Sequence, residues 1–144
     1  MTKGLAEPYD LNQEDVDITQ ADTVANVWGD LFLFRAPIGR SLVLRPGDPF
    51  GAYLKDTAGA EALDTVRVKL EHRDATGAEK QPVTTEILYA SIKEFQDEDL
   101  LFRLPITREI EVAEQEYLSL MAYSGVAISK DTSYFDLTTR SKRG

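Results

Sequence analysis

The chain has 144 residues, 42% of them hydrophobic, a net charge of −9 at pH 7, and no cysteine. A chain of this length and composition can bury one hydrophobic core, so we expect one folded domain. The absence of cysteine excludes disulfides, thiolate zinc sites and cysteine nucleophiles. The acidic balance disfavours a nucleic-acid partner, which would need a basic face.

The chain begins with an acidic segment. Residues 1–22 carry six acidic residues and one lysine, and the other 122 residues carry a net charge of only −4. The segment lacks the basic and apolar regions of a signal peptide, and no apolar run of the chain reaches the roughly 18 residues of a membrane helix. We therefore expect no signal peptide, no transmembrane segment and no membrane partner.

Residues 1–25 are predicted to form an extended N-terminal arm, because their apolar residues show no helical period. A disordered solubility tail is the alternative, but such a tail would not need spaced apolar side chains. Each of them would contribute roughly 1.5–3 kcal/mol if it were buried in a partner's pocket. The residues expected to bind a neighbouring subunit in this way are Leu5, Tyr9, Leu11, Val16 and Ile18.

After the arm, the pattern becomes that of β-strands. Residues 27–34 are apolar on both faces, as in a buried strand, and residues 41–45 predict a second strand before a loop rich in proline and glycine. Residues 65–73 alternate strictly between apolar and polar side chains, which is typical of a half-buried antiparallel strand. Residues 82–95 are rich in β-branched and aromatic residues and predict the returning strand of a long hairpin.

Turn signals recur about every ten residues to the end of the chain. The fold class predicted for residues 26–139 is therefore all-β, an antiparallel β-sandwich or jelly roll of about eight strands, without a long amphipathic helix. Residues 140–144 are predicted to be a basic C-terminal tail, in which Arg140, Lys142 and Arg143 could contact a partner. Further strands are expected at 100–104, 108–113, 116–124, 126–129 and 133–139.

No catalytic signature is present. His72 is the only histidine, and its place at the end of an apolar strand face indicates packing, since no GxSxG, HExxH or phosphate-loop motif accompanies it. The acidic segment 96–99 could supply the carboxylates of a hydrolase, with Asp97 and Asp99 as candidates, but a solvated turn is the simpler interpretation. We expect a protein that is not an enzyme.

Two kinds of binding site remain as alternatives. Asp15, Asp17 and Thr19 resemble the start of a calcium loop, but Gln20 stands where such a loop needs glycine, so no metal or cofactor is predicted. Exposed aromatic rings such as Trp28 or Tyr53 could bind a sugar, as in a carbohydrate-binding module. For Trp28, which lies among apolar residues, the expectation is a place in the core.

In overall layout the chain is similar to the decoration, or cement, proteins of tailed-virus (phage) capsids. The resemblance lies in the arm GLAEPYDLNQEDVDITQAD, followed by the strands from VWGDLFLF to SYFDLTT, and it covers nearly the whole chain without a diagnostic motif. It implies an oligomeric virion protein, such as a homotrimer, assembled in the host cytoplasm. Such a protein would bind a major capsid protein and stabilise the particle through contacts between subunits. Head-completion, neck and tail proteins share these traits.

Overall fold

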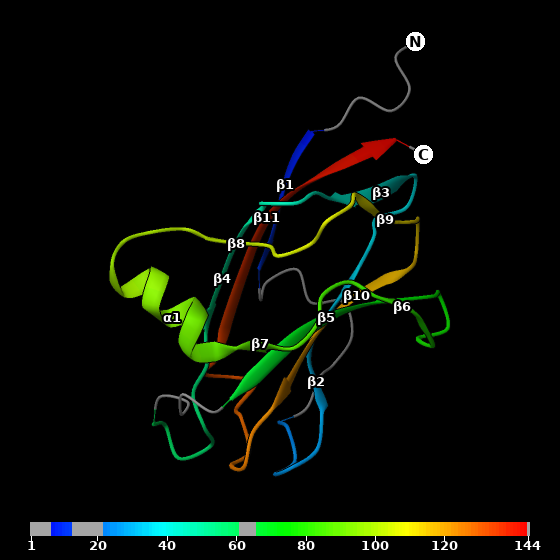
Figure 1. The fold of residues 1–144 in the computed structure, drawn as a ribbon. Coiled ribbons are helices and arrows are strands. Elements are labelled where there is room, and N and C mark those ends of the chain that lie inside the picture. The colour runs from blue at the N-terminus through cyan, green and yellow to red at the C-terminus, as the bar shows by residue number, and fades with distance from the viewer. Residues whose placement is uncertain (1–6, 13–21, 61–65, 144) are drawn as a thin grey trace.

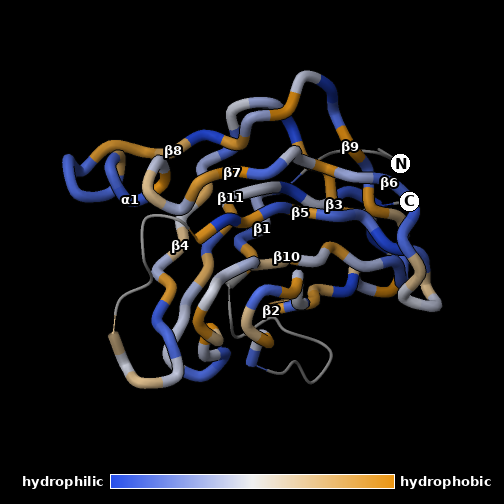
Figure 2. The backbone as a smooth tube through the Cα atoms, turned by 60° about the horizontal axis from the view of Figure 1, so that its bottom comes forward, coloured by the Kyte–Doolittle hydropathy of each residue, from blue (hydrophilic) through white to orange (hydrophobic). Residues whose placement is uncertain are grey.

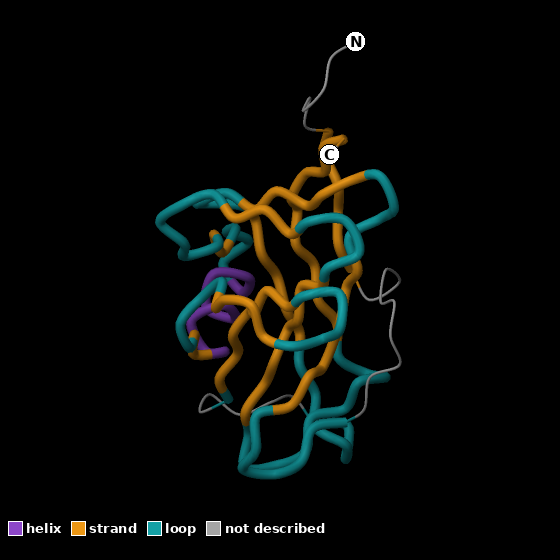
Figure 3. The backbone as a smooth tube through the Cα atoms, turned by 90° about the vertical axis from the view of Figure 1, so that its right-hand side faces the viewer, coloured by secondary structure: helices purple, strands orange, loops and turns teal. Residues whose placement is uncertain are grey.

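The protein is a sandwich of two antiparallel sheets with one short helix at its side (Figures 1 and 3). The computed structural model describes residues 7–12, 22–60 and 66–143. Sheet A contains β1 (Glu7–Asn12), β3 (Arg40–Leu44), β4 (Pro49–Tyr53), β8 (Phe102–Arg103), β9 (Ile110–Val112) and β11 (Tyr134–Arg143). Sheet B contains β2 (Gly29–Arg35), β5 (Arg67–Arg73), β6 (Glu79–Pro82), β7 (Ile87–Leu88) and β10 (Tyr117–Tyr123), and α1 (Tyr89–Asp97) connects β7 to β8.

Several short strands are halves of one interrupted strand. β1 pairs with residues of β11 that also face β3 and β4, so β3 and β4 must share the opposite edge of β11. Arg140 faces Val43 and Leu137 faces Phe50, so three steps along β11 correspond to seven along β3 and β4. The loop between β3 and β4 therefore inserts four residues into an otherwise continuous strand. By the same reasoning β8 and β9 share one edge of sheet A, and β6 and β7 share one edge of β5.

Counted in this way, each sheet has four strand positions. Sheet A has the order β1, β11, β3/β4, β9/β8, and sheet B has the order β2, β10, β5, β6/β7. Along the chain, strands cross from one sheet to the other in the winding of an eight-stranded jelly roll. This confirms the predicted fold class, an antiparallel β-sandwich of jelly-roll type.

The core lies between the two sheets, where apolar segments of both line up (Figure 2). Alternation along β5 is as predicted, since Val68, Leu70 and His72 are all buried. Four aromatic rings from both sheets meet in the middle, with ring centroids 5.3 to 6.3 Å apart, close enough for favourable aromatic contacts. They belong to Phe32, Phe34, Phe50 and Phe135.

The structure corrects the expected N-terminal arm. Residues 7–12 form β1, which pairs with β11 in the sheet of their own domain. Leu11 is only 1% exposed and belongs to the core, and Tyr9 packs against the core. These two side chains have their place within this chain instead of on the expected neighbour. Leu5, Val16 and Ile18 lie outside the described residues.

The expected basic tail is also part of the sheet. β11 continues to Arg143, and residues 140–143 pair with β3. Arg140 makes an ion pair with Asp48 at 2.8 Å, and Lys142 makes one with Glu111 at 3.4 Å. Both cations are therefore neutralised within the domain, although sequence alone placed them on a free tail.

The strand expected at 82–95 ends early and becomes α1 at Tyr89. The helix closes an edge of β4 that β8 does not cover. The Gln96 amide accepts a hydrogen bond from the Ala52 N–H and donates one to the Ala52 carbonyl, both at 2.9 Å, and the Tyr89 hydroxyl accepts one from the Leu54 N–H at 3.0 Å. Exposed strand edges carry unpaired backbone groups, so tertiary contacts override the β-propensity of this segment.

Residues 126–129, also expected as a strand, form only an isolated bridge between Ile128 and Asp56. Val126, the first residue of this segment, is exposed. A Ser-Gly turn directly before them leaves the segment in a loop instead of a ladder.

The place of Leu11 in the core gives a first prediction. Leu11→Ala should lower the free energy of unfolding by about 2–5 kcal/mol, because it leaves a cavity under β1. Urea denaturation followed by circular dichroism would measure this change. Ile38→Ala, at a side chain that is 80% exposed, is the control and should change stability little. An unchanged stability for Leu11→Ala would show that β1 does not pack on its own domain.

Candidate functional site

His72 is buried and hydrogen-bonded through both ring nitrogens. Arg108 can only donate, so the Gln81 oxygen accepts its hydrogen bond at 2.8 Å, and the Gln81 amide nitrogen must donate to His72 Nδ1 at 2.9 Å. His72 Nε2 is then the donor to Glu116 Oε1, at 2.8 Å. The ring is 1% exposed and ties β5 to β6 and to the residue directly before β10. It acts as a structural link, more deeply buried than the half-covered strand end expected from the sequence.

Glu116 is the centre of this buried network. Burial alone would raise its pKa, but hydrogen bonds from Lys80 Nζ, from His72 and from the backbone N–H of Ala113 outweigh burial and hold the pKa of Glu116 below its ordinary value. The carboxylate is thus fully occupied by donors. It is poorly suited to act as a catalytic base.

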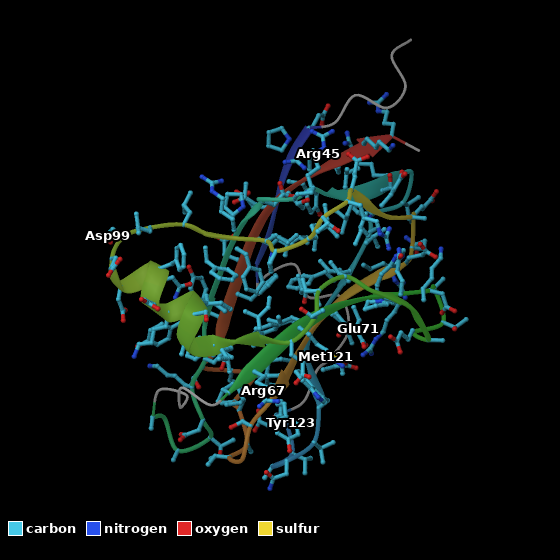
Figure 4. The ribbon with its side chains drawn as sticks, viewed as in Figure 1. Arg45, Arg67, Glu71, Asp99, Met121 and Tyr123 are labelled. Carbon is cyan, nitrogen blue, oxygen red and sulfur yellow. The ribbon has the colours of Figure 1, made fainter. Side chains whose placement is uncertain are left out.

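The acidic segment 96–99 forms the end of α1 and the turn after it. Asp97 is the last helical residue, Glu98 is the C-cap, and Asp99 has a positive φ of 57°. All three side chains are exposed, and Figure 4 shows Asp99 at the outer end of the loop, away from the other labelled residues. This is the solvated turn that the sequence favoured, without the desolvated carboxylate that glycoside hydrolysis needs.

Within residues 7–12, 22–60 and 66–143, no three His, Asp or Glu side chains are placed to hold a metal ion. The calcium candidates Asp15, Asp17 and Thr19 are outside these ranges. In the same part of the chain, no helix is both long and apolar enough to cross a membrane.

The outer face of sheet B carries a compact ion-pair network. Arg73 donates to both carboxylate oxygens of Asp30 at 2.6 Å and to Glu71 at 3.1 Å, and the Ser119 hydroxyl donates to Asp30 at 2.9 Å. Burial alone would lower the pKa of Arg73, but these two carboxylates raise it above its ordinary value. The network explains how Glu71, predicted to face solvent, can be buried on this face.

Trp28 lies on this outer face, outside the core in which it was expected. Its ring centroid is 5.6 Å from that of Tyr123, and the Lys69 ammonium lies 4.5 Å from the ring centroid. A hollow of about 450 Å³ beside them is bordered by the ion pair of Arg67 with Glu86; Figure 4 shows Arg67 and Tyr123 on neighbouring strands. Lys69 and Tyr123 already pack on the indole, so the geometry gives sugar stacking little support.

A second hollow, of about 360 Å³, opens on the outer face of sheet A beside the end of α1. We call it the α1–β11 groove. Apolar side chains are unusually exposed at its rim: Leu100 is 53%, Leu101 59% and Tyr134 45% exposed. Tyr53, a sugar-site candidate, faces Tyr134 in the register of β4 and β11 and is also exposed. The groove is defined here by Gly51, Gln96, Leu100, Leu101, Tyr134 and Asp136.

Asp136 is the charged group of the groove. Burial raises its pKa above the ordinary value, and the nearby negative charge of Asp10 raises it further. No described residue forms an ion pair with either carboxylate. The floor beside Asp136 is Gly51, where a Cβ atom would come within 3.2 Å of the Gln96 amide oxygen. The groove is therefore an apolar hollow with a partly desolvated acid at its base.

Sequence reasoning missed this site. Leu100 and Leu101 were assigned to a strand, and Asp136 is one acid among many. Only the crossing of α1, β4 and β11 brings them together, so no local pattern could have indicated the groove.

Glu116 gives a pH-dependent prediction. Its folded pKa lies below the unfolded value of about 4.3, so the stability it contributes is present above that pH and is lost as pH falls through the folded pKa. Glu116→Gln should cost about 1–3 kcal/mol at pH 7, because hydrogen bonds to a charged acceptor are lost. The cost should shrink as pH falls below the unfolded value and through the folded pKa, where the wild-type carboxylate becomes protonated. Denaturant melts at pH 7 and at successively lower pH measure it, with the exposed Glu114→Gln as control; a cost independent of pH would contradict the assignment.

Asp136 gives the opposite prediction. The folded pKa of Asp136 is raised above its unfolded value of about 3.9. The stability linked to this carboxyl group is therefore fully present below the unfolded pKa and is lost as pH rises through the folded pKa, where the group becomes charged. Asp136→Asn removes the charge at nearly constant volume and should raise Tm at pH 7, with no gain at about pH 3. Differential scanning calorimetry would test this, with Asp97→Asn at an exposed site expected to leave Tm unchanged. A lower Tm at pH 7 would mean that the carboxylate has a stabilising partner.

Solved structures of bacteriophage capsid proteins share this fold. VP17, a capsid protein of bacteriophage P23-77, aligns over 100% of this chain and 99% of its own chain, with a TM-score of 0.68 and 8% sequence identity. The VP16-VP17 complex, formed by the two major capsid proteins of that bacteriophage, aligns over 98% of this chain and 100% of that chain, with a TM-score of 0.66 and 10% identity. No protein-family model and no curated protein matches the sequence. The comparison confirms the resemblance to phage capsid proteins as one of fold.

Proposed function

We propose that this chain is a non-enzymatic structural subunit of a bacteriophage particle. The observation that carries the proposal is the end-to-end match to phage capsid proteins, which leaves almost no part of either chain outside the common jelly roll. The buried and fully hydrogen-bonded state of His72 and Glu116 agrees with a role that does not need catalysis. Its location would be the virion, with assembly in the host cytoplasm.

The position within the particle is a finer question. The layout of the sequence favours a decoration protein that clamps capsid interfaces, and we keep this as one form of the proposal. The two similar structures are a capsid protein and a complex of two major capsid proteins. This likeness favours a place in the shell itself, with copies of this chain or a second capsid protein as partners. A homotrimer, or a position in the neck or tail, remains a further alternative.

Deleting the gene for this chain from the virus that encodes it would distinguish a decoration protein from a shell protein. If the chain decorates the shell, closed particles should still form but lose resistance to heat and osmotic shock. If it builds the shell, electron microscopy should show no closed particles. Immunogold labelling at a single vertex would indicate a neck or tail position.

The proposal as a whole requires that this chain is incorporated into the virus particle. Mass spectrometry of purified wild-type particles should find the chain in many copies per particle, with a host enzyme of similar abundance as the contamination control. Its absence from the particles would refute a structural role in the virion.

A further inference from the structure

The α1–β11 groove has the features of a docking site. Its rim exposes three large apolar side chains side by side, those of Leu100, Leu101 and Tyr134. Contiguous exposed apolar surface is uncommon on soluble domains unless it binds something. Here it borders a hollow that the structure keeps open, because Gly51 has no side chain and Gln96 is held by two hydrogen bonds to Ala52.

The charge of the groove specifies what it can bind. Asp136 and Asp10 are both acidic, and burial and mutual repulsion raise the pKa of Asp136 because no described cation offsets them. A ligand with a cation next to an apolar side chain would satisfy both parts of the groove. A peptide segment in which a lysine is followed closely by a leucine offers both the cation and the apolar side chain.

Outside the described ranges, the chain contains one such segment. The only basic residue there is Lys3, and Leu5 stands two positions further on. In an extended segment, side chains two positions apart point the same way, roughly 6.5–7 Å from each other. Bound in such an extended form, residues 3–6 would present the Lys3 ammonium group and the Leu5 isobutyl group on one face.

The position of β1 favours a second copy as the source of this segment. β1 starts at Glu7, opposite Ser141, whereas Asp136 faces Asn12 at the other end of the strand. These two ends are about 17 Å apart at the usual rise per strand residue. Residues that precede Glu7 would have to reverse direction to reach the groove of their own subunit, but a neighbouring subunit can deliver them without a reversal.

We propose that the α1–β11 groove binds residues 3–6 of a second copy of this chain. The Lys3 ammonium lies against the carboxylates of Asp136 and Asp10, and the Leu5 side chain lies between Leu101 and Tyr134. The inference extends the proposed function, because it names a contact that holds neighbouring subunits together. It also returns Leu5 to the role expected from the sequence, that of an anchor in a partner.

Sedimentation velocity of the full chain over a range of concentrations tests the contact. The wild type should self-associate, and Lys3→Gln, Leu5→Ala and Asp136→Asn should each weaken association about fivefold to tenfold, as expected for about 1 kcal/mol or slightly more per contact. Glu114→Gln and Val126→Ala, at exposed positions that do not line the groove, are the matched controls for charge and for apolar surface and should associate like the wild type.

The double variant Lys3→Gln/Asp136→Asn shows whether the two residues touch. If they form one ion pair, the double variant should associate no more weakly than either single variant. Exchanging the charges, in Lys3→Asp/Asp136→Lys, should recover part of the lost affinity. Asp136→Asn should at the same time raise Tm at pH 7, so weaker association could not be attributed to unfolding.

Three results would overturn the inference. They are a chain that stays monomeric at all concentrations, an association that Asp136→Asn leaves unchanged, and effects of Lys3→Gln and Asp136→Asn that are fully additive. A monomer whose Tm falls with Lys3→Gln would indicate binding of the segment within its own subunit. None of these results bears on incorporation into particles. The structural role in the virion is tested separately, by mass spectrometry of purified particles.

Discussion

The architecture depends on the pairing of β11 along both of its edges. β1 occupies one edge, and β3 and β4 occupy the other in succession. Because the register of β11 is fixed on both sides, the four additional residues between β3 and β4 have to leave the sheet as a loop. Asp48 in this loop accepts hydrogen bonds from the Arg45 backbone N–H and from Arg140, so the loop is held to the end of β3 and to β11.

The same pairing places the apolar residues of the core. Phe135 and Leu137 lie in the core on the inward face of β11, and the Phe135 ring contacts the aromatic rings of β2 and β4. One strand thus links the hydrogen bonding of sheet A to the packing between the sheets. Outward-facing residues of β11 alternate with them, and Tyr134 and Asp136 thereby form one wall of the groove. The candidate docking site is thus a direct consequence of the strand that organises the core.

The groove also follows from the way in which one strand edge is closed. β8 covers only the beginning of β4, and α1 covers the next part through Gln96 and Tyr89. After α1 the chain returns toward β8 through Leu100 and Leu101, which remain exposed. Asp136, whose pKa is raised by burial and by the charge of Asp10, lines the same groove. Perturbed pKa values are concentrated at functional sites.

Local sequence patterns determined the all-β class of this protein and most of its strands. Strict alternation indicated β5 and β9, because side chains of a half-buried strand point alternately to the core and to solvent. Tertiary structure alone decided that residues 7–12 and 140–143 are strands of the domain, that residues 89–97 are a helix, and that Asp136 meets Leu101 in a groove. Pairing between Leu11 and Leu137 joins opposite ends of the chain. Such long-range hydrogen bonds and contacts leave no period in the local sequence, and they become visible only when the folded chain brings the two segments together.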